Sequence, residues 1–169
     1  MLVLASVCLL TWPVAGHVQT SFAGAWRSDG TRTAGPAVDG SAVSARGNLL
    51  DASPATAFRN VEERVTQSVQ TLTIERRSSG GRQKFVYRLD GAESVNVNGA
   101  SKRTTRSRWN GDTLVTEGTE ALSSTRGALS NAFREARSIG NDGAMVVETT
   151  REFEGGGRTV SVLAFVKKK

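Results

Sequence analysis

Two pairs of glutamates are close enough in the chain to suggest acid–base chemistry, namely Glu117 with Glu120 and Glu148 with Glu152. Paired carboxylates act as general acid and base when they are held in different protonation states. In an extended strand Glu117 and Glu120 point to opposite faces, because side chains alternate. Glu148 and Glu152 share a face, but it is the polar face of their segment. Both pairs are therefore predicted to be ordinary surface charge.

The other residue types that catalyse reactions are scarce or badly placed. His17 is the only histidine and Cys8 the only cysteine, which removes histidine-based triads and cysteine-ligated metal sites. No serine lies in a Gly-x-Ser-x-Gly turn. The sequence therefore predicts a protein that is not an enzyme, with no catalytic residue, no metal site and no cofactor.

Aromatic and small polar side chains recur at alternating positions that would face one interior. A barrel of about eight strands either fills with side chains or holds one small ligand. The mixture of aromatic with small polar residues favours a cavity for an apolar or amphipathic molecule, and a packed aromatic core is the alternative. The candidate ligand-binding residues are Trp26, Phe85, Tyr87, Thr105, Ser107, Trp109 and Phe153.

Basic residues form a second candidate site on the opposite faces of two strands. The chain carries 22 Lys and Arg against 16 Asp and Glu, a net charge of +6. Such a surface can attract an anionic envelope polymer or lipid headgroups, with an ordinary solvated face as the alternative. Nucleic acid is not expected, since the protein is predicted to be exported. The candidate patch comprises Lys84, Arg88, Lys102, Arg106 and Arg108.

The elements that must position these residues are short strands. From Val65 onward apolar and polar residues alternate, and glycine-containing turns such as Asn98-Gly99 and Asn110-Gly111 separate the segments. No segment there is long enough for a crossover helix. The pattern predicts an all-β, antiparallel up-and-down meander of about eight or nine strands. We expect it to close as a barrel, which removes exposed edges, with a curved open sheet as second choice.

The N-terminal residues resemble a leader for export. Residues 1–16 are uncharged and apolar but too short to span a bilayer, and they end on a small residue. We therefore expect a signal peptide at 1–16, a single domain at 17–169 with no transmembrane span, and a periplasmic or extracellular location. Glycine, alanine and serine predominate at about 33–54, which predicts a long irregular loop. Nothing in the sequence fixes the oligomeric state.

Gly24-Ala25-Trp26 resembles the Gly-x-Trp signature that opens lipocalin-type barrels. The resemblance implies that Trp26 plugs one end of a barrel and that a basic side chain from a late strand packs over it. Arg151 is the candidate for this barrel-closing pair, and a position at the barrel rim is its alternative. The layout also resembles small exported bacterial proteins of uncharacterised function, through Leu72-Thr73-Ile74, the Trp109–Leu114 hairpin and an apolar last strand that ends in lysines. That resemblance implies export and a barrel, but no activity.

Overall fold

The computed structural model describes residues 19–39, 60–124, 127–154 and 156–169, and its regular elements are antiparallel strands. The predicted leader, His17 and most of the predicted loop lie outside the described residues. The strands are β1 (Gly24–Ser28), β2 (Ala34–Asp39), β3 (Glu62–Gln67), β4 (Thr71–Ser78), β5 (Gly81–Arg88), β6 (Glu93–Asn98), β7 (Ser101–Asn110), β8 (Thr113–Ser124), β9 (Gly127–Ile139), β10 (Met145–Phe153) and β11 (Arg158–Lys167).

Ten of these strands follow one another around a nearly closed barrel in the order β5-β4-β3-β1-β11-β10-β9-β8-β7-β6. The predicted all-β meander is therefore confirmed, but the predicted count of eight or nine strands is too low. The additional strand β2 pairs with β11 beside β1, and its residues Ala34–Asp39 occupy the start of the segment predicted as a loop. Backbone pairing with β11 orders this segment although its composition favours a loop.

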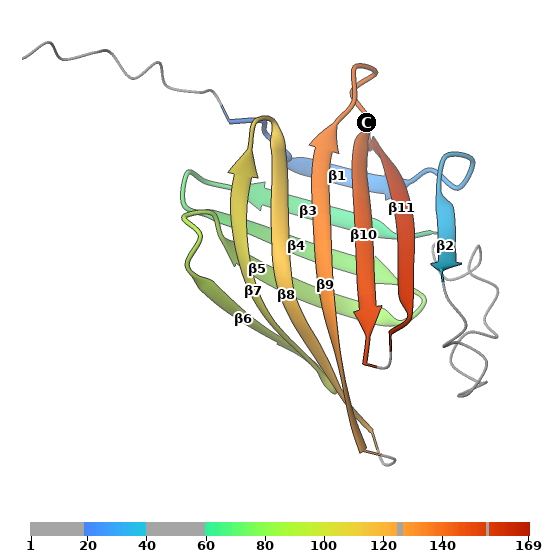
Figure 1. The fold of residues 1–169 in the computed structure, drawn as a ribbon. Helices are drawn as coiled ribbons and strands as arrows, with labels where there is room; N and C mark the ends of the chain where they lie inside the picture. Colours follow the sequence, from blue (N-terminus) through green and yellow to red (C-terminus); the bar gives the residue numbers. More distant parts are fainter. Residues whose placement is uncertain (1–18, 40–59, 125–126, 155) are drawn as a thin grey trace, which may run out of the picture.

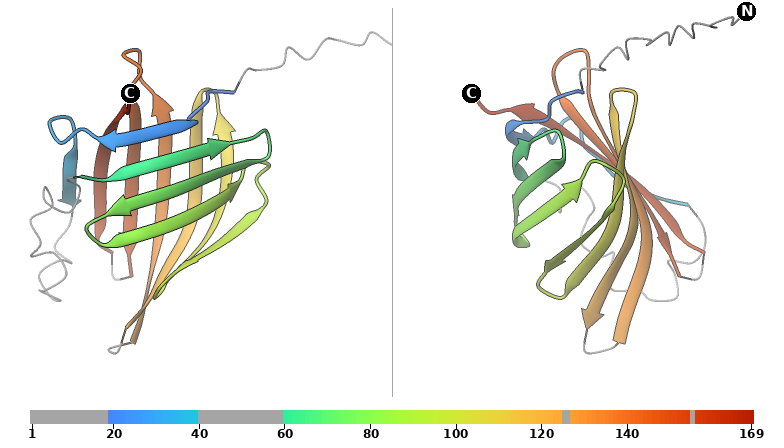
Figure 2. Two further views of the ribbon diagram at one scale, coloured as in Figure 1. Left: turned by 180° about the vertical axis from the view of Figure 1, so that it is seen from behind. Right: turned by 90° about the vertical axis from the view of Figure 1, so that its left-hand side faces the viewer.

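The barrel is flattened into two layers whose strands cross (Figure 1). One layer contains β1, β3, β4 and β5, and the other contains β7 to β11; Figure 2 shows both layers from the side and from behind. Such packing encloses the inward-facing side chains of both layers in one core. At one corner the sheet continues without a break from β3 through β1 to β11.

At the other corner, between β5 and β6, side chains replace the backbone ladder, and we call this contact the seam. Three side chains of β6 accept hydrogen bonds from backbone N–H groups of β5. These bonds join Asn98 Oδ1 to Lys84 at 2.9 Å, Asn96 Oδ1 to Val86 at 2.7 Å and Ser94 Oγ to Arg88 at 2.8 Å. Asn96 and Asn98 also donate through Nδ2 to the carbonyl oxygens of the same two β5 residues, Val86 and Lys84, at 3.0 Å each. The two ends of the sheet are therefore joined by the amide side chains of Asn96 and Asn98 and by the Ser94 hydroxyl, in place of a backbone ladder.

Glycines permit the tight turns and the strong coiling of this sheet. Gly99 and Gly111 have φ of 60° and 58°, a left-handed conformation that glycine adopts without strain, and the two predicted Asn-Gly hairpins form there. Gly118 on β8 lies directly against β7, where a Cβ would overlap the carbonyl oxygen of Thr104. Only glycine allows the two strands to approach so closely at this position.

Candidate ligand-binding interior

An apolar cluster occupies one part of the barrel interior. Phe22, which precedes β1, is fully buried and stacks on Trp109 with ring centroids 5.7 Å apart. Trp26 is 2% exposed, and its indole Nε1 donates to the Phe22 carbonyl oxygen at 2.8 Å. Gln67 accepts from the Phe22 amide at 2.8 Å. These bonds fix the segment before β1 against the apolar core.

The cation that covers Trp26 is Lys167 and not the predicted Arg151. Lys167 Nζ lies 5.4 Å from the Trp26 ring centroid, since Trp26 and Lys167 are paired in register on β1 and β11. Gly24 makes room for it, because a Cβ there would lie 2.8 Å from Lys167 Cε. Arg151, on β10, instead has its Nε 3.7 Å from Glu120. The cation over the Trp26 ring therefore comes from the last strand, β11, whereas a residue of β10 was expected there.

Charged side chains fill another part of the interior, around Glu63 on β3. Its carboxylate accepts from Arg76 Nη2 at 2.6 Å and from Arg137 Nη1 at 2.7 Å. Arg137 also donates to Glu135 at 3.0 Å and to the Met145 sulfur at 3.1 Å. Glu63 and Arg137 are 2% and 1% exposed, so these charges rely on one another in place of water.

A second group of charges lies beside the first and centres on Glu120. Arg103 Nε donates to Glu120 at 2.8 Å, and Arg151 approaches the other carboxylate oxygen of Glu120. The Arg103 guanidinium also lies 4.6 Å from the Phe85 ring centroid. Arg76 lies over the same ring at 5.7 Å. Phe85 therefore connects the two groups of charges by cation–π contacts.

Together these seven side chains form what we call the interior ion network, which has four arginines and three glutamates: Arg76, Arg103, Arg137, Arg151, Glu63, Glu120 and Glu135. One positive charge is in surplus. Burial would raise the pKa of Glu63, but the guanidiniums of Arg137 and Arg76 outweigh it and lower that pKa to about 2. Burial lowers the pKa of Arg151, which shares its carboxylate with Arg103. Arg151 is therefore the cation with the weakest compensation.

Two buried donor atoms have no hydrogen-bond partner within the described part of the chain, Trp109 Nε1 and Arg137 Nε. Both side chains belong to one row across the sheet, because Trp109 is in register with Leu114 and Leu114 with Arg137. An unpaired buried donor is unfavourable by about 1–3 kcal/mol. An acceptor oxygen from water or from a ligand would satisfy either atom.

Most of the predicted ligand-binding residues lie in the core. Trp26, Phe85 and Tyr87 are buried in the core cluster, and the partly buried Trp109 packs against that cluster. Thr105 and Ser107 are buried and already bonded: Ser107 shares a 2.8 Å hydrogen bond with Thr116, and Thr105 donates to the Ser94 carbonyl at 3.5 Å. Phe153 is half-buried at the end of β10, apart from the core cluster.

The predicted basic patch is brought together on the outside of the barrel. Lys84 and Arg88 lie on β5, and the other three lie on β7, with β6 between these strands. All five side chains are exposed. Of the glutamate pairs, Glu148 and Glu152 are also exposed, whereas Glu120 points inward and Glu117 outward.

Sequence reasoning missed the interior ion network although it left a signal. Its charges occupy inward positions within strands, where every second residue faces the interior. Glu63 lies two residues from Val61 and from Val65, and Arg137 lies two residues from Glu135 and from Ile139. A charge in such a position must be paired inside or reach a rim. The nearly equal numbers of arginines and glutamates at inward positions indicate that these side chains form ion pairs inside the barrel.

No family model matches the sequence, and neither does any curated protein. Solved structures with this barrel do match. Zebrafish ileal bile acid-binding protein complexed with cholic acid is 15% identical, with a TM-score of 0.56 over 87% of this chain and 98% of that one. A REP1-NXSQ fatty acid transporter is 12% identical, with a TM-score of 0.56 over 87% and 96%. Caenorhabditis elegans lipid binding protein 8 in its apo form is 13% identical, with a TM-score of 0.54 over 87% and 95%.

The likeness to these three structures shows the fold alone, a nearly closed antiparallel β-barrel. In the described ranges no helix is long and apolar enough to cross a membrane. The same ranges contain no cluster of three or more His, Cys, Asp or Glu side chains placed to hold a metal ion.

Proposed function

We propose that the protein binds one small anionic amphipathic molecule inside its barrel and catalyses no reaction. The observation that carries the proposal is the surplus positive charge of the interior ion network beside an apolar cluster. Arg151, the cation with the weakest pairing, has a side chain that is 29% exposed, and a partly buried charge is stabilised when an anion balances it. The names of the matched structures, which refer to bile acid, fatty acid and lipid, support the same class of ligand.

The ligand would lie with its anionic group toward Arg151 and Arg103 and its apolar part against the aromatic cluster. Arg151 is the natural contact, since its only ion pair in the described structure is the 3.7 Å approach to a shared carboxylate. One groove of about 660 Å³ lies over β3, β4 and β5, and its lining residues include Glu63 and Arg76 of the interior ion network.

Titration with a fluorescent fatty-acid analogue, followed by tryptophan emission, tests the proposal. We expect saturable one-to-one binding that an unlabelled fatty acid or bile acid displaces. Arg151→Gln should weaken it about tenfold, the value of one hydrogen bond to a charged group. Arg158→Gln, an exposed change on β11, is the matched control and should have no effect. Absence of saturable binding with several anionic amphipaths would refute the proposal.

We also propose that the protein is exported after removal of residues 1–16. N-terminal sequencing of protein purified from its source should then give His17 as the first residue. An N-terminus that retains the apolar segment would contradict export by this route.

A further inference from the structure

Three exposed valines lie together over the seam. Val86 on β5 and Val95 and Val97 on β6 are 38%, 54% and 66% exposed. The inward neighbours of the β6 valines, Ser94 and Asn96, are the side chains that bond to β5. Val86 is itself bonded to Asn96 through its backbone, so the valines of the two strands are adjacent across the seam.

Cations border these valines on both sides. Lys84 and Arg88 flank Val86 along β5, and Lys102 and Arg106 project from the neighbouring strand β7. Val97 is paired in register with Lys102. We call these three valines and four cations the seam face.

The charges of the seam face remain available to a partner. Lys84 and Lys102 form no ion pair within the described residues. Arg88 is bonded to Asp90 at 2.6 Å and Arg106 approaches Glu93 at 3.8 Å, but all four of these side chains are about half exposed or more. Exposed pairs of this kind are weak and exchange readily with other anions.

We propose that the seam face docks on the surface of an anionic phospholipid bilayer. An apolar centre with a cationic border matches the boundary between acyl chains and negatively charged headgroups. The valines would enter that boundary, and the lysines and arginines would lie among the headgroups. This docking is independent of whether the barrel holds a ligand.

The composition of the seam face favours a bilayer over other occupants. A soluble polyanion would use the cations but would gain nothing from the valines. A second copy of the chain would place cations against cations, and three valines supply far less than the roughly 800 Å² per partner of a stable interface. Only the bilayer uses both features at once.

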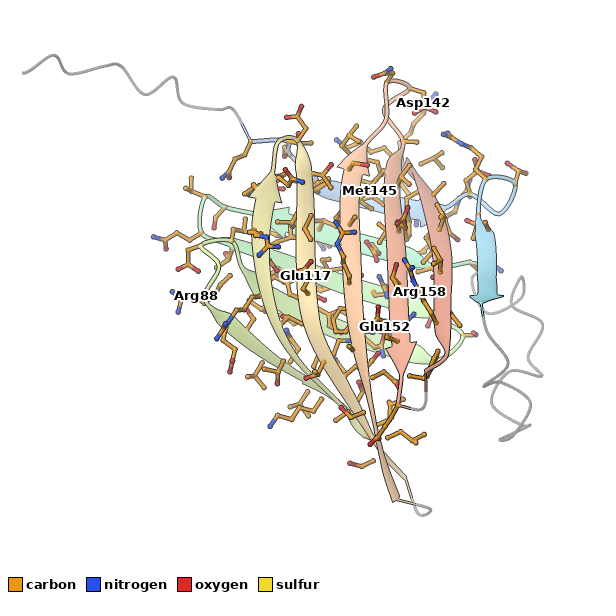
Figure 3. All side chains as sticks on the ribbon, viewed as in Figure 1. Arg88, Glu117, Asp142, Met145, Glu152 and Arg158 are labelled. Atoms are coloured by element: carbon orange, nitrogen blue, oxygen red, sulfur yellow. The ribbon has the colours of Figure 1, made fainter. Side chains whose placement is uncertain are left out.

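Vesicle co-sedimentation tests the docking, with phosphatidylcholine vesicles that contain or lack phosphatidylglycerol. We expect binding only to the anionic vesicles, and a steep decrease with added salt. The double variant K84Q/K102Q should bind about twenty-five-fold more weakly, from about fivefold for each basic residue near an anionic surface. The control R134Q/R158Q removes the same number of positive charges, from β9 and β11, and its binding to anionic vesicles should decrease only slightly. Figure 3 shows Arg158 on the side of the barrel away from Arg88.

The valines provide the decisive comparison. V95S/V97S should bind anionic vesicles about tenfold more weakly, whereas V69S, a change at a turn residue that is 82% exposed, should bind as the unchanged protein does. Each variant is checked for an unchanged circular dichroism spectrum.

Three outcomes would overturn the proposal. Binding unaffected by V95S/V97S, together with equal binding to a soluble polyanion, would identify the face as a polyanion site. An equal loss of vesicle binding in K84Q/K102Q and R134Q/R158Q would show that the net charge of the protein, and not the seam face, causes the binding. Binding to vesicles that lack phosphatidylglycerol would show that attraction between the cations and anionic headgroups is not needed for docking. The fatty-acid titration without vesicles, repeated on V95S/V97S, separates this result from the proposed function, because ligand binding should not change.

Discussion

Glu63→Gln removes the negative charge that Arg76 and Arg137 share, and its effect should depend on pH. The folded protein holds the pKa of Glu63 at about 2, against an ordinary value of 4.5. A lowered pKa means that the folded state binds the proton less tightly than the unfolded state. The stabilisation is therefore complete above pH 4.5 and is lost as pH falls toward 2. It amounts to about 3 kcal/mol at neutral pH, of which about 2 kcal/mol should be lost by pH 3.

Urea unfolding followed by tryptophan fluorescence between pH 3 and pH 7 measures this effect. The quantity of interest is the difference in unfolding free energy between the unchanged protein and E63Q, because the contributions of carboxylates far from the interior ion network cancel in that difference. That difference should shrink by about 2 kcal/mol from pH 7 to pH 3. A difference for E63Q that stays constant with pH would show that Glu63 is not an ionised partner of the two arginines.

Three further substitutions test the barrel itself. Trp26→Ala should lower the unfolding free energy by about 3–5 kcal/mol, because a buried indole is removed; an unchanged melting temperature would show that Trp26 is not part of the core. Asn96→Ala should speed hydrogen exchange of the Val86 amide, measured by mass spectrometry, and unchanged exchange there would contradict the side-chain seam. Gly118→Ala should destabilise by several kcal/mol, because β7 and β8 must separate; a thermal melt like that of the unchanged protein would exclude the close approach.

The barrel could be predicted because one rule governs most of the chain. Alternation of apolar and polar residues from Val65 onward defines strands, and Asn-Gly pairs define hairpins. Strand β2 could not be predicted in this way, because Ala34–Asp39 has a composition typical of loops and is ordered by pairing with a distant strand. The seam could not be predicted either. The asparagines of β6 bond to β5 only because the fold brings these two ends of the sheet together.

The interior could be predicted only for its aromatic half. Phe85 and Tyr87 follow the apolar pattern, but Glu63 and Arg137 contradict it, and their burial becomes favourable only when the fold places them 2.7 Å apart. Lys167 looks like part of a solubilising lysine tail, yet its register with Trp26 makes it the cation over that ring. Contacts between strands that are distant in the sequence determine both the burial of Glu63 and Arg137 and the position of Lys167.

The most direct test of a ligand-binding interior is isothermal titration calorimetry with dodecanoate, below its critical micelle concentration, at two temperatures. We predict one saturable site per chain and a negative heat-capacity change, the signature of apolar burial, with weaker binding in Arg151→Gln. Heats that equal those of dilution, for dodecanoate and for a bile acid alike, would contradict a ligand-binding site inside the barrel.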